Sequence, residues 1–75
     1  MRAMISPTRS FMIRINGENV DMEEIRLADY LADNGYKTAR IAVECNEAMV
    51  PKSEYDDFVL HSGDIVEIVS FVGGG

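Results

Sequence analysis

The segment that most constrains the fold lies near the end of the chain. Residues 65–72 read Ile-Val-Glu-Ile-Val-Ser-Phe-Val, and most of them are β-branched or aromatic. A near-continuous run of this kind is typical of a strand buried on both faces, because a half-exposed strand alternates apolar and polar residues. The run therefore predicts a strand over 65–72 in the middle of a sheet.

A β-hairpin is predicted near the beginning of the chain. Residues 11–15 carry Phe, Ile and Ile at every second position, which is the period of a strand. Asn16 and Gly17 follow, and both residue types tolerate the positive φ of a tight type I′ turn. Residues 18–22 then run back with the same alternation.

One helix is predicted over about residues 27–34. Its apolar residues recur at helical spacing, and Gly35 suits the left-handed position after a helix. Glu23 and Glu24 lie near its start, where the helix dipole favours negative charge.

Two short strands are predicted in the second half of the chain, over residues 40–44, with Cys45 as a candidate extension, and over residues 48–50. Asn46-Glu47 forms the turn between them, and Pro51 ends the pairing because it lacks an N–H. The order of elements is α+β, and a mixed sheet of about four or five strands on one helix is the β-grasp, or ubiquitin-like, arrangement.

The chain has 75 residues, which suffices for one domain. We expect that domain to occupy residues 11–71. Residues 1–10 show no periodicity and are interpreted as a disordered leader, or as an extension from an upstream start codon or from cloning. Residues 72–75 are predicted to form a flexible C-terminal tail.

The net charge of −6 argues against nucleic acid and anionic membranes as partners. It favours a protein partner with a basic groove, although the acids also keep a small domain in solution. No apolar run approaches the roughly 20 residues that span a bilayer. A single cysteine, Cys45, excludes an internal disulfide and fits the reducing cytoplasm.

The sequence offers no convincing internal active site or metal site. The acidic pairs Glu23-Glu24 and Asp56-Asp57 are adjacent, and neighbouring residues do not face each other in a strand or a helix. His61 lies beside Ser62 and Asp64, but residues of one loop do not easily reach the geometry of a catalytic triad. Cys45 is interpreted as a packed thiol rather than a nucleophile.

The three terminal glycines carry the chemistry. Without a Cβ they can thread a narrow slot in a partner protein, and Gly75 ends in a free carboxylate. An adenylated carboxylate is a mixed anhydride that a nucleophile attacks at the carbonyl carbon. The alternative interpretation is a frayed end or a cloning remnant.

Residues 63–75, from Gly-Asp through the apolar strand to Val-Gly-Gly-Gly, resemble the C-terminus of the ThiS family, the sulfur carrier proteins of thiamine biosynthesis. Ile15-Asn16-Gly17-Glu18 and residues 43–51 also resemble that family, and the likeness covers residues 12–75. Cys45 and Ala48 depart from it, because an aliphatic residue and a glycine or polar turn residue are more usual there.

The resemblance implies a carrier that is a co-substrate and not an enzyme. An ATP-dependent, ThiF-like activating enzyme would adenylate Gly75, sulfur from a cysteine desulfurase would give a thiocarboxylate, and thiazole synthase would take that sulfur. ATP would belong to the partner, with no cofactor or metal bound by the carrier. Partner contacts are assigned to Phe71, Val72, Gly73 and Gly74; for Phe71 and Val72, packing at the strand end is an equal alternative.

Four other functions remain open from the sequence. The small subunit of molybdopterin synthase shares the fold and the glycine thiocarboxylate, although its tail more often has two glycines. Sulfur carriers for cysteine or methionine synthesis share the tail chemistry. A ubiquitin-like modifier would join Gly75 to a lysine, and a plain interaction domain would have an inert tail.

Overall fold

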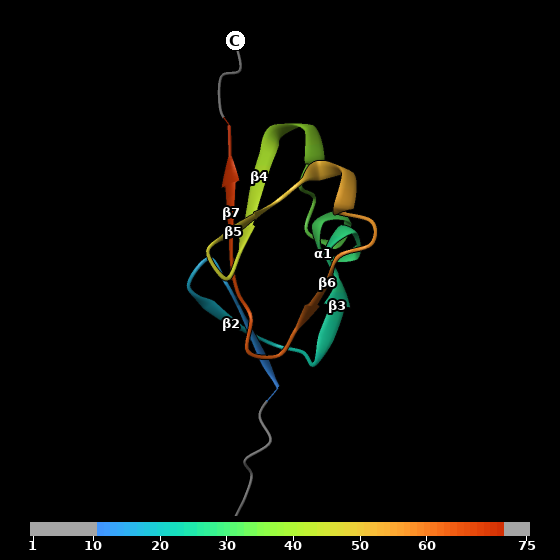
Figure 1. Cartoon of the computed structure of the whole chain (residues 1–75). Helices are drawn as coiled ribbons and strands as arrows, with labels where there is room; N and C mark the ends of the chain where they lie inside the picture. Colours follow the sequence, from blue (N-terminus) through green and yellow to red (C-terminus); the bar gives the residue numbers. More distant parts are fainter. Residues whose placement is uncertain (1–10, 72–75) are drawn as a thin grey trace, which may run out of the picture.

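A computed structural model of the chain describes residues 11–71. Five strands form one sheet over a single helix, and two further strands form a small second sheet (Figure 1). The elements in chain order are β1 (Met12–Ile15), β2 (Glu18–Asp21), β3 (Glu24–Arg26), α1 (Leu27–Asp33), β4 (Ile41–Cys45), β5 (Ala48–Val50), β6 (Val59–His61) and β7 (Ile65–Ser70), with short 3-10 helices at Thr38–Arg40 and Lys52–Glu54.

Strand β7 lies at the centre of the main sheet, whose order is β2-β1-β7-β4-β5. It pairs parallel with β1 on one side and antiparallel with β4 on the other. The central position predicted for the last strand is confirmed, and so is the β-grasp arrangement of a mixed sheet on one helix. The strand ends at Ser70, and the predicted residue 72 lies outside the described residues.

Both predicted hairpin turns are present. Asn16 and Gly17 have φ of 52° and 83°, the pair of positive values that the type I′ turn requires. Asn46 and Glu47 have φ of 52° and 72°, so the β4–β5 hairpin turns in the same way. Gly35, with φ of 75°, follows the helix as expected.

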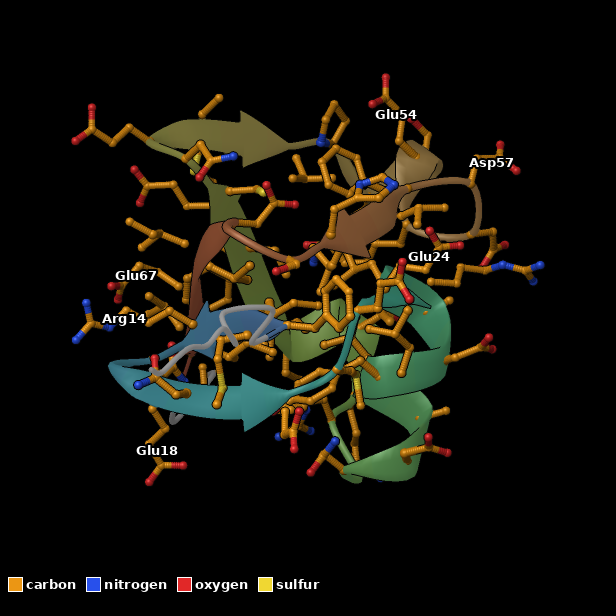
Figure 2. The ribbon with its side chains drawn as sticks, turned by 90° about the horizontal axis from the view of Figure 1, so that it is seen from below. Arg14, Glu18, Glu24, Glu54, Asp57 and Glu67 are labelled. Atoms are coloured by element: carbon orange, nitrogen blue, oxygen red, sulfur yellow. The ribbon has the colours of Figure 1, made fainter. Side chains whose placement is uncertain are left out.

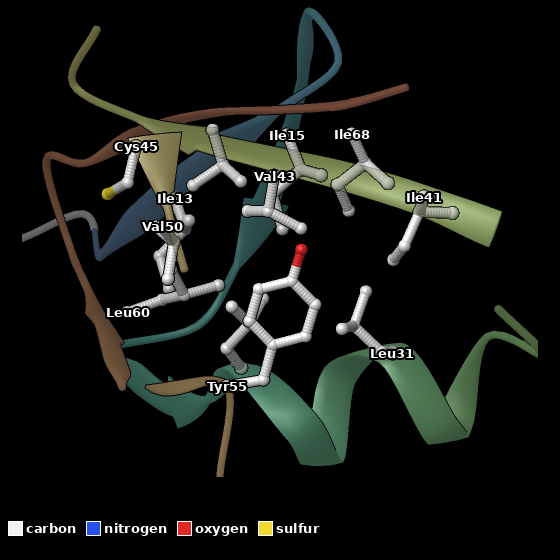
Figure 3. Close-up of a cluster of buried hydrophobic side chains, with 12 residues drawn as sticks. Ile13, Ile15, Leu31, Ile41, Val43, Cys45, Val50, Tyr55, Leu60 and Ile68 are labelled. Atoms are coloured by element: carbon white, nitrogen blue, oxygen red, sulfur yellow. The ribbon is translucent and has the colours of Figure 1, made fainter. Parts of the chain in front are cut away.

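The core lies between the sheet and α1, where side chains from most of the strands meet the helix (Figure 3). Its buried members are Ile13, Ile15, Leu27, Leu31, Ile41, Val43, Cys45, Val50, Tyr55, Leu60, Val66 and Ile68. Only one face of the sheet contributes to it. The opposite face carries no helix (Figure 1).

The prediction that the last strand is buried on both faces is wrong. Val66 and Ile68 point into the core with 0% and 7% exposure, whereas Ile65 and Val69 are 50% and 55% exposed. Within residues 11–71 there is a single α-helix, which covers one face of the sheet and leaves the other without a helix. Core packing therefore does not explain the apolar residues on the exposed side of β7, Ile65 and Val69.

The helix begins at Leu27 as predicted, but the residues before it form an element that was not expected. Glu24 belongs to strand β3, which pairs with β6, and neither strand of this small sheet was expected in that form. The helix begins at Leu27 without a side-chain cap. Its first N–H groups instead donate to the loop before β6, from Leu27 to Phe58 at 2.8 Å and from Ala28 to Tyr55 at 3.2 Å.

The two faces of β7 allow a matched test of the fold. We expect Val66→Ala to lower the free energy of unfolding by roughly 2 kcal/mol, because two buried methyl groups are lost and a cavity remains. Val69→Ala removes the same atoms from the exposed face and should change stability by less than about 0.5 kcal/mol. Urea denaturation measures both. Equal losses would contradict the one-sided burial of β7.

Candidate functional site

Phe71 is the last described residue, and it is the one predicted site residue that the structure places. Val72, Gly73, Gly74 and Gly75 lie outside the described residues, so their predicted roles stay predictions. The predicted boundaries of the leader and the tail likewise fall on residues that are not described. The structure does define the segment that carries the tail, residues 65–71, which we call the tail base.

Hydrogen bonds to β4 hold the tail base over its whole length. The register runs from Cys45 opposite Val66 to Ile41 opposite Ser70. The ladder continues one residue past the strand, because the Phe71 N–H donates to the Arg40 carbonyl at 2.7 Å. The described chain is therefore fixed up to its last residue.

Two turn residues lock the beginning of the tail base. The Ile65 N–H donates to Asn46 Oδ1 at 2.9 Å, and Asn46 Nδ2 donates to Asp64 Oδ1 at 3.0 Å. The other oxygen of Asp64 accepts the His61 N–H at 2.8 Å. The turn between β4 and β5 is thereby joined to the turn before β7.

Asn16 locks the middle of the tail base. Its N–H donates to the Val66 carbonyl at 2.9 Å, and its Oδ1 accepts the Ile68 N–H at 2.7 Å. The side chain continues the pairing of β7 beyond the end of β1. Sequence reasoning placed Asn16 and Asn46 in turns but missed these bonds, which depend on a strand distant in the chain.

The outer side of the tail base belongs to an exposed surface that we call the open face. By strand alternation and register it comprises outward residues of the sheet and the residue after β7: Met12, Arg14, Asn19, Asp21, Ala42, Glu44, Met49, Ile65, Glu67, Val69 and Phe71. Figure 2 shows the side chains of Arg14 and Glu67 projecting away from the helix. Phe71 is 54% exposed, so it is not packed in the core.

The open face combines apolar side chains with several acids and one base, Arg14. Glu44 and Glu67 are directly opposite each other on β4 and β7. Like charges in this position are destabilising. Glu47 joins these two acids around a shallow depression that also includes Asn46 and Ile65. This acidic apolar surface is suited to a protein partner with complementary basic and apolar groups.

The other candidates do not form a catalytic constellation. His61 Nε2 lies 3.8 Å from Glu24 Oε1 on the surface, while the Ser62 hydroxyl accepts the Met12 N–H at 3.2 Å. Asp64 bonds to the His61 backbone N–H and not to its imidazole, so the three side chains do not form a catalytic relay. Burial, followed by the charge and hydrogen bonding of Asp64, raises the pKa of the Cys45 thiol, which disfavours the nucleophilic thiolate.

Within residues 11–71, no three or more His, Cys, Asp and Glu side chains are gathered so that they could hold a metal ion. No helix in that part of the chain is long and apolar enough to cross a membrane.

Substitution of Asn16 tests whether its side chain secures the tail base. Glycine accepts the positive φ but offers no acceptor, whereas aspartate tolerates φ > 0 and keeps an oxygen. We expect Asn16→Gly to be less stable than Asn16→Asp by about 1 kcal/mol. The Ile68 amide should exchange its hydrogen faster in Asn16→Gly. Unchanged exchange at Ile68 would show that the bond does not hold the strand.

The raised pKa of Cys45 predicts a loss of stability in alkali. An unfolded chain releases the thiol proton above about pH 8.5, while the folded chain retains it, so stability falls as pH rises through this range. Cys45→Ala should show a shallower decline between about pH 8 and 9.5. Urea denaturation at a series of pH values measures the two slopes; identical slopes would contradict the prediction.

Comparison with known proteins places this geometry in a family. The family model described as the ThiS family matches residues 10–75. The sulfur carrier protein ThiS of Bacillus subtilis is 33% identical over 66 residues, covering 85% of this chain and 100% of that protein. A crystal structure of the thiamine biosynthesis protein ThiS from Geobacter metallireducens superposes with a TM-score of 0.70 at 26% identity, covering 85% of this chain and 99% of that chain.

A second kind of relative is much longer. The thiazole synthase of Paramagnetospirillum magneticum is 39% identical over 62 residues, which make up 81% of this chain and 19% of the synthase. This chain spans about a fifth of the length of the two thiazole synthases that it matches. The family match, the small carrier relatives and the shared β-grasp structure agree, and the chain belongs to the ThiS family of sulfur carrier proteins.

Proposed function

We propose that this protein carries sulfur for the formation of the thiazole ring in thiamine biosynthesis. The observation that carries the proposal is a central strand, hydrogen-bonded up to Phe71, that leads directly into a terminal Val-Gly-Gly-Gly. Membership of the ThiS family supports it. In this role the protein is a co-substrate of other enzymes and not an enzyme itself.

The proposed chemistry takes place at the carboxylate of Gly75. A ThiF-like activating enzyme joins this carboxylate to AMP from ATP and releases pyrophosphate. A persulfide sulfur supplied through a cysteine desulfurase then displaces AMP. A second thiol then attacks the donor cysteine's sulfur in the resulting acyl disulfide; a disulfide forms between the two thiols and the thiocarboxylate leaves. ATP is the partner's substrate, so the carrier needs no cofactor of its own.

The domain contributes a rigid base and a tail whose last three residues have no side chain. Residues 73–75 have no Cβ, so they fit a narrow slot that would exclude bulkier residues. The tail base stays fixed by β4 and Asn16 while the tail is handed from one enzyme to the next. We place these steps in the cytoplasm, where reducing conditions preserve the buried Cys45 thiol and the thiocarboxylate.

Thiazole synthase is the proposed sulfur acceptor. Two proteins named thiazole synthase contain a segment similar to this chain. The presence of both parts in one polypeptide supports the proposal that the carrier delivers its sulfur to a thiazole synthase. We assign the docking surface to the open face. Its apolar residues next to the tail include Phe71, and Val72 follows directly; the acids Glu44 and Glu67 favour a partner with basic residues.

Intact mass of the protein purified from cells tests the function. We expect a fraction of the chain to carry sulfur in place of one oxygen at the C-terminus. This fraction should disappear when the gene for the activating enzyme is deleted, because the carboxylate is then never adenylated. Gly75 found joined to lysines of other proteins, with no thiocarboxylate, would overturn the carrier role in favour of a protein modifier.

Two tail variants serve as controls in the same assay. Deletion of Gly75 should abolish adenylation, measured as pyrophosphate exchange, and leave folding intact because the tail follows the last hydrogen-bonded residue of the described domain. Gly74→Phe should also block activation, by steric exclusion from the slot. Normal exchange with either variant would contradict the proposed entry of the tail into the activating enzyme.

A further inference from the structure

The two sides of β7 are paired to different extents. On the β4 side, pairing continues to Phe71. On the other side, β1 pairs only with Ile65 and Val66, because the chain turns away at Asn16-Gly17. In Figure 1, β7 extends beyond the β1–β2 hairpin.

The register shows which backbone groups of β7 point to this second side, away from β4. The Phe71 N–H bonds to the Arg40 carbonyl on β4's side. Backbone groups of successive residues point to opposite sides of a strand, so those of Ser70 and Ile68 point away from β4. Asn16 Oδ1 already accepts a hydrogen bond from the Ile68 N–H. Within residues 11–71, no strand pairs with the Ile68 carbonyl or the Ser70 N–H. We call the stretch from Ile68 to Phe71 on this side the β7 edge.

The β7 edge differs from the other edges of the main sheet. Proteins usually protect open edges with charges, prolines or very short strands, because an exposed edge pairs readily with another chain. Strand β2 carries Glu18 and Asp21, and the three-residue β5 is followed by Pro51. The β7 edge reads Ile-Val-Ser-Phe and has none of these protections, and its residues Val69 and Phe71 are exposed.

We propose that the β7 edge receives an extended segment of the enzymes that process the C-terminus, which adds to the sheet as a further strand. This inference rests on the proposed carrier function and specifies how partners recognise the carrier. Main-chain hydrogen bonds to Ile68 and Ser70 give the pairing, and apolar side chains of the added strand cover Val69 and Phe71.

The position of the edge favours a processing enzyme as the occupant. Residues 72–75 follow Phe71 directly, so a strand paired with the edge leads to the group that reacts. A second copy of this chain is a poorer fit. Each copy has a net charge of −6, so pairing along β7 would bring two acidic domains together.

Proline substitution tests the Ser70 N–H directly. Proline removes this donor and places its ring on the edge, while the domain loses no described hydrogen bond. We expect Ser70→Pro to bind the cognate activating enzyme and thiazole synthase about tenfold more weakly than Ser70→Ala, which lacks the same hydroxyl but keeps the N–H. Isothermal titration gives the affinities, and circular dichroism verifies the fold.

Asn19 supplies a matched control on the far edge of the sheet. The Met22 N–H bonds to Phe11, so by alternation the Asn19 N–H also points away from its neighbouring strand. Asn19→Pro should therefore bind both enzymes as Asn19→Ala does. Equal weakening by the Asn19 and Ser70 prolines would overturn the assignment of the added strand to β7.

Hydrogen exchange of the wild-type protein is a second test that needs no variant. The Ser70 amide should exchange rapidly in the free protein and slow at least about tenfold in each complex, while Asn19 is unaffected. Rapid exchange at Ser70 in a complex that still forms thiocarboxylate would overturn the inference and leave the carrier function intact. Protection of Ser70 in the free protein, by residues 1–10 or by a second copy, would also overturn it. Absence of both binding and thiocarboxylate would overturn the function and the inference together.

Discussion

The antiparallel ladder between β4 and β7 is the interaction on which the rest of this structure depends. Its register decides which residues of β7 face the helix and which face outward. A shift by one residue would expose Val66 and Ile68 and bury Glu67 against α1. The same ladder ends with the bond between Phe71 and Arg40, so core packing and the position of the tail base are set by one set of hydrogen bonds.

The single α-helix of the described residues explains why one face of the sheet has no helix packed on it. The core uses the inward residues of each strand, and the described chain has no second layer for the outward ones. The open face nevertheless keeps apolar residues next to a pair of opposed acids, Glu44 and Glu67. Neither feature stabilises the isolated domain. Both are understandable if the surface is completed by another protein with basic and apolar groups.

Local chemistry made part of the fold predictable from the sequence. The alternation of residues 11–15, the positive-φ turn at Asn16-Gly17 and the β-branched last strand each depend on near neighbours, and each was found as expected. Strands β3 and β6 have three residues each, too few to show a period, and they were missed. One-sided burial of β7 and the bonds of Asn16 depend on distant segments, so no local pattern revealed them.

In the proposed carrier role, the size of the domain explains why the chemistry is left to other proteins. A chain of 75 residues has a small core, and here that core contains no buried polar or charged side chain among the described residues. What such a domain can do is present a chain end at a defined distance from a rigid surface. Four residues beyond Phe71 span at most about 14 Å. In the proposed role, a partner that docks on the tail base therefore has to place its reacting atoms within that radius, which would tie recognition of the surface to delivery of the carboxylate.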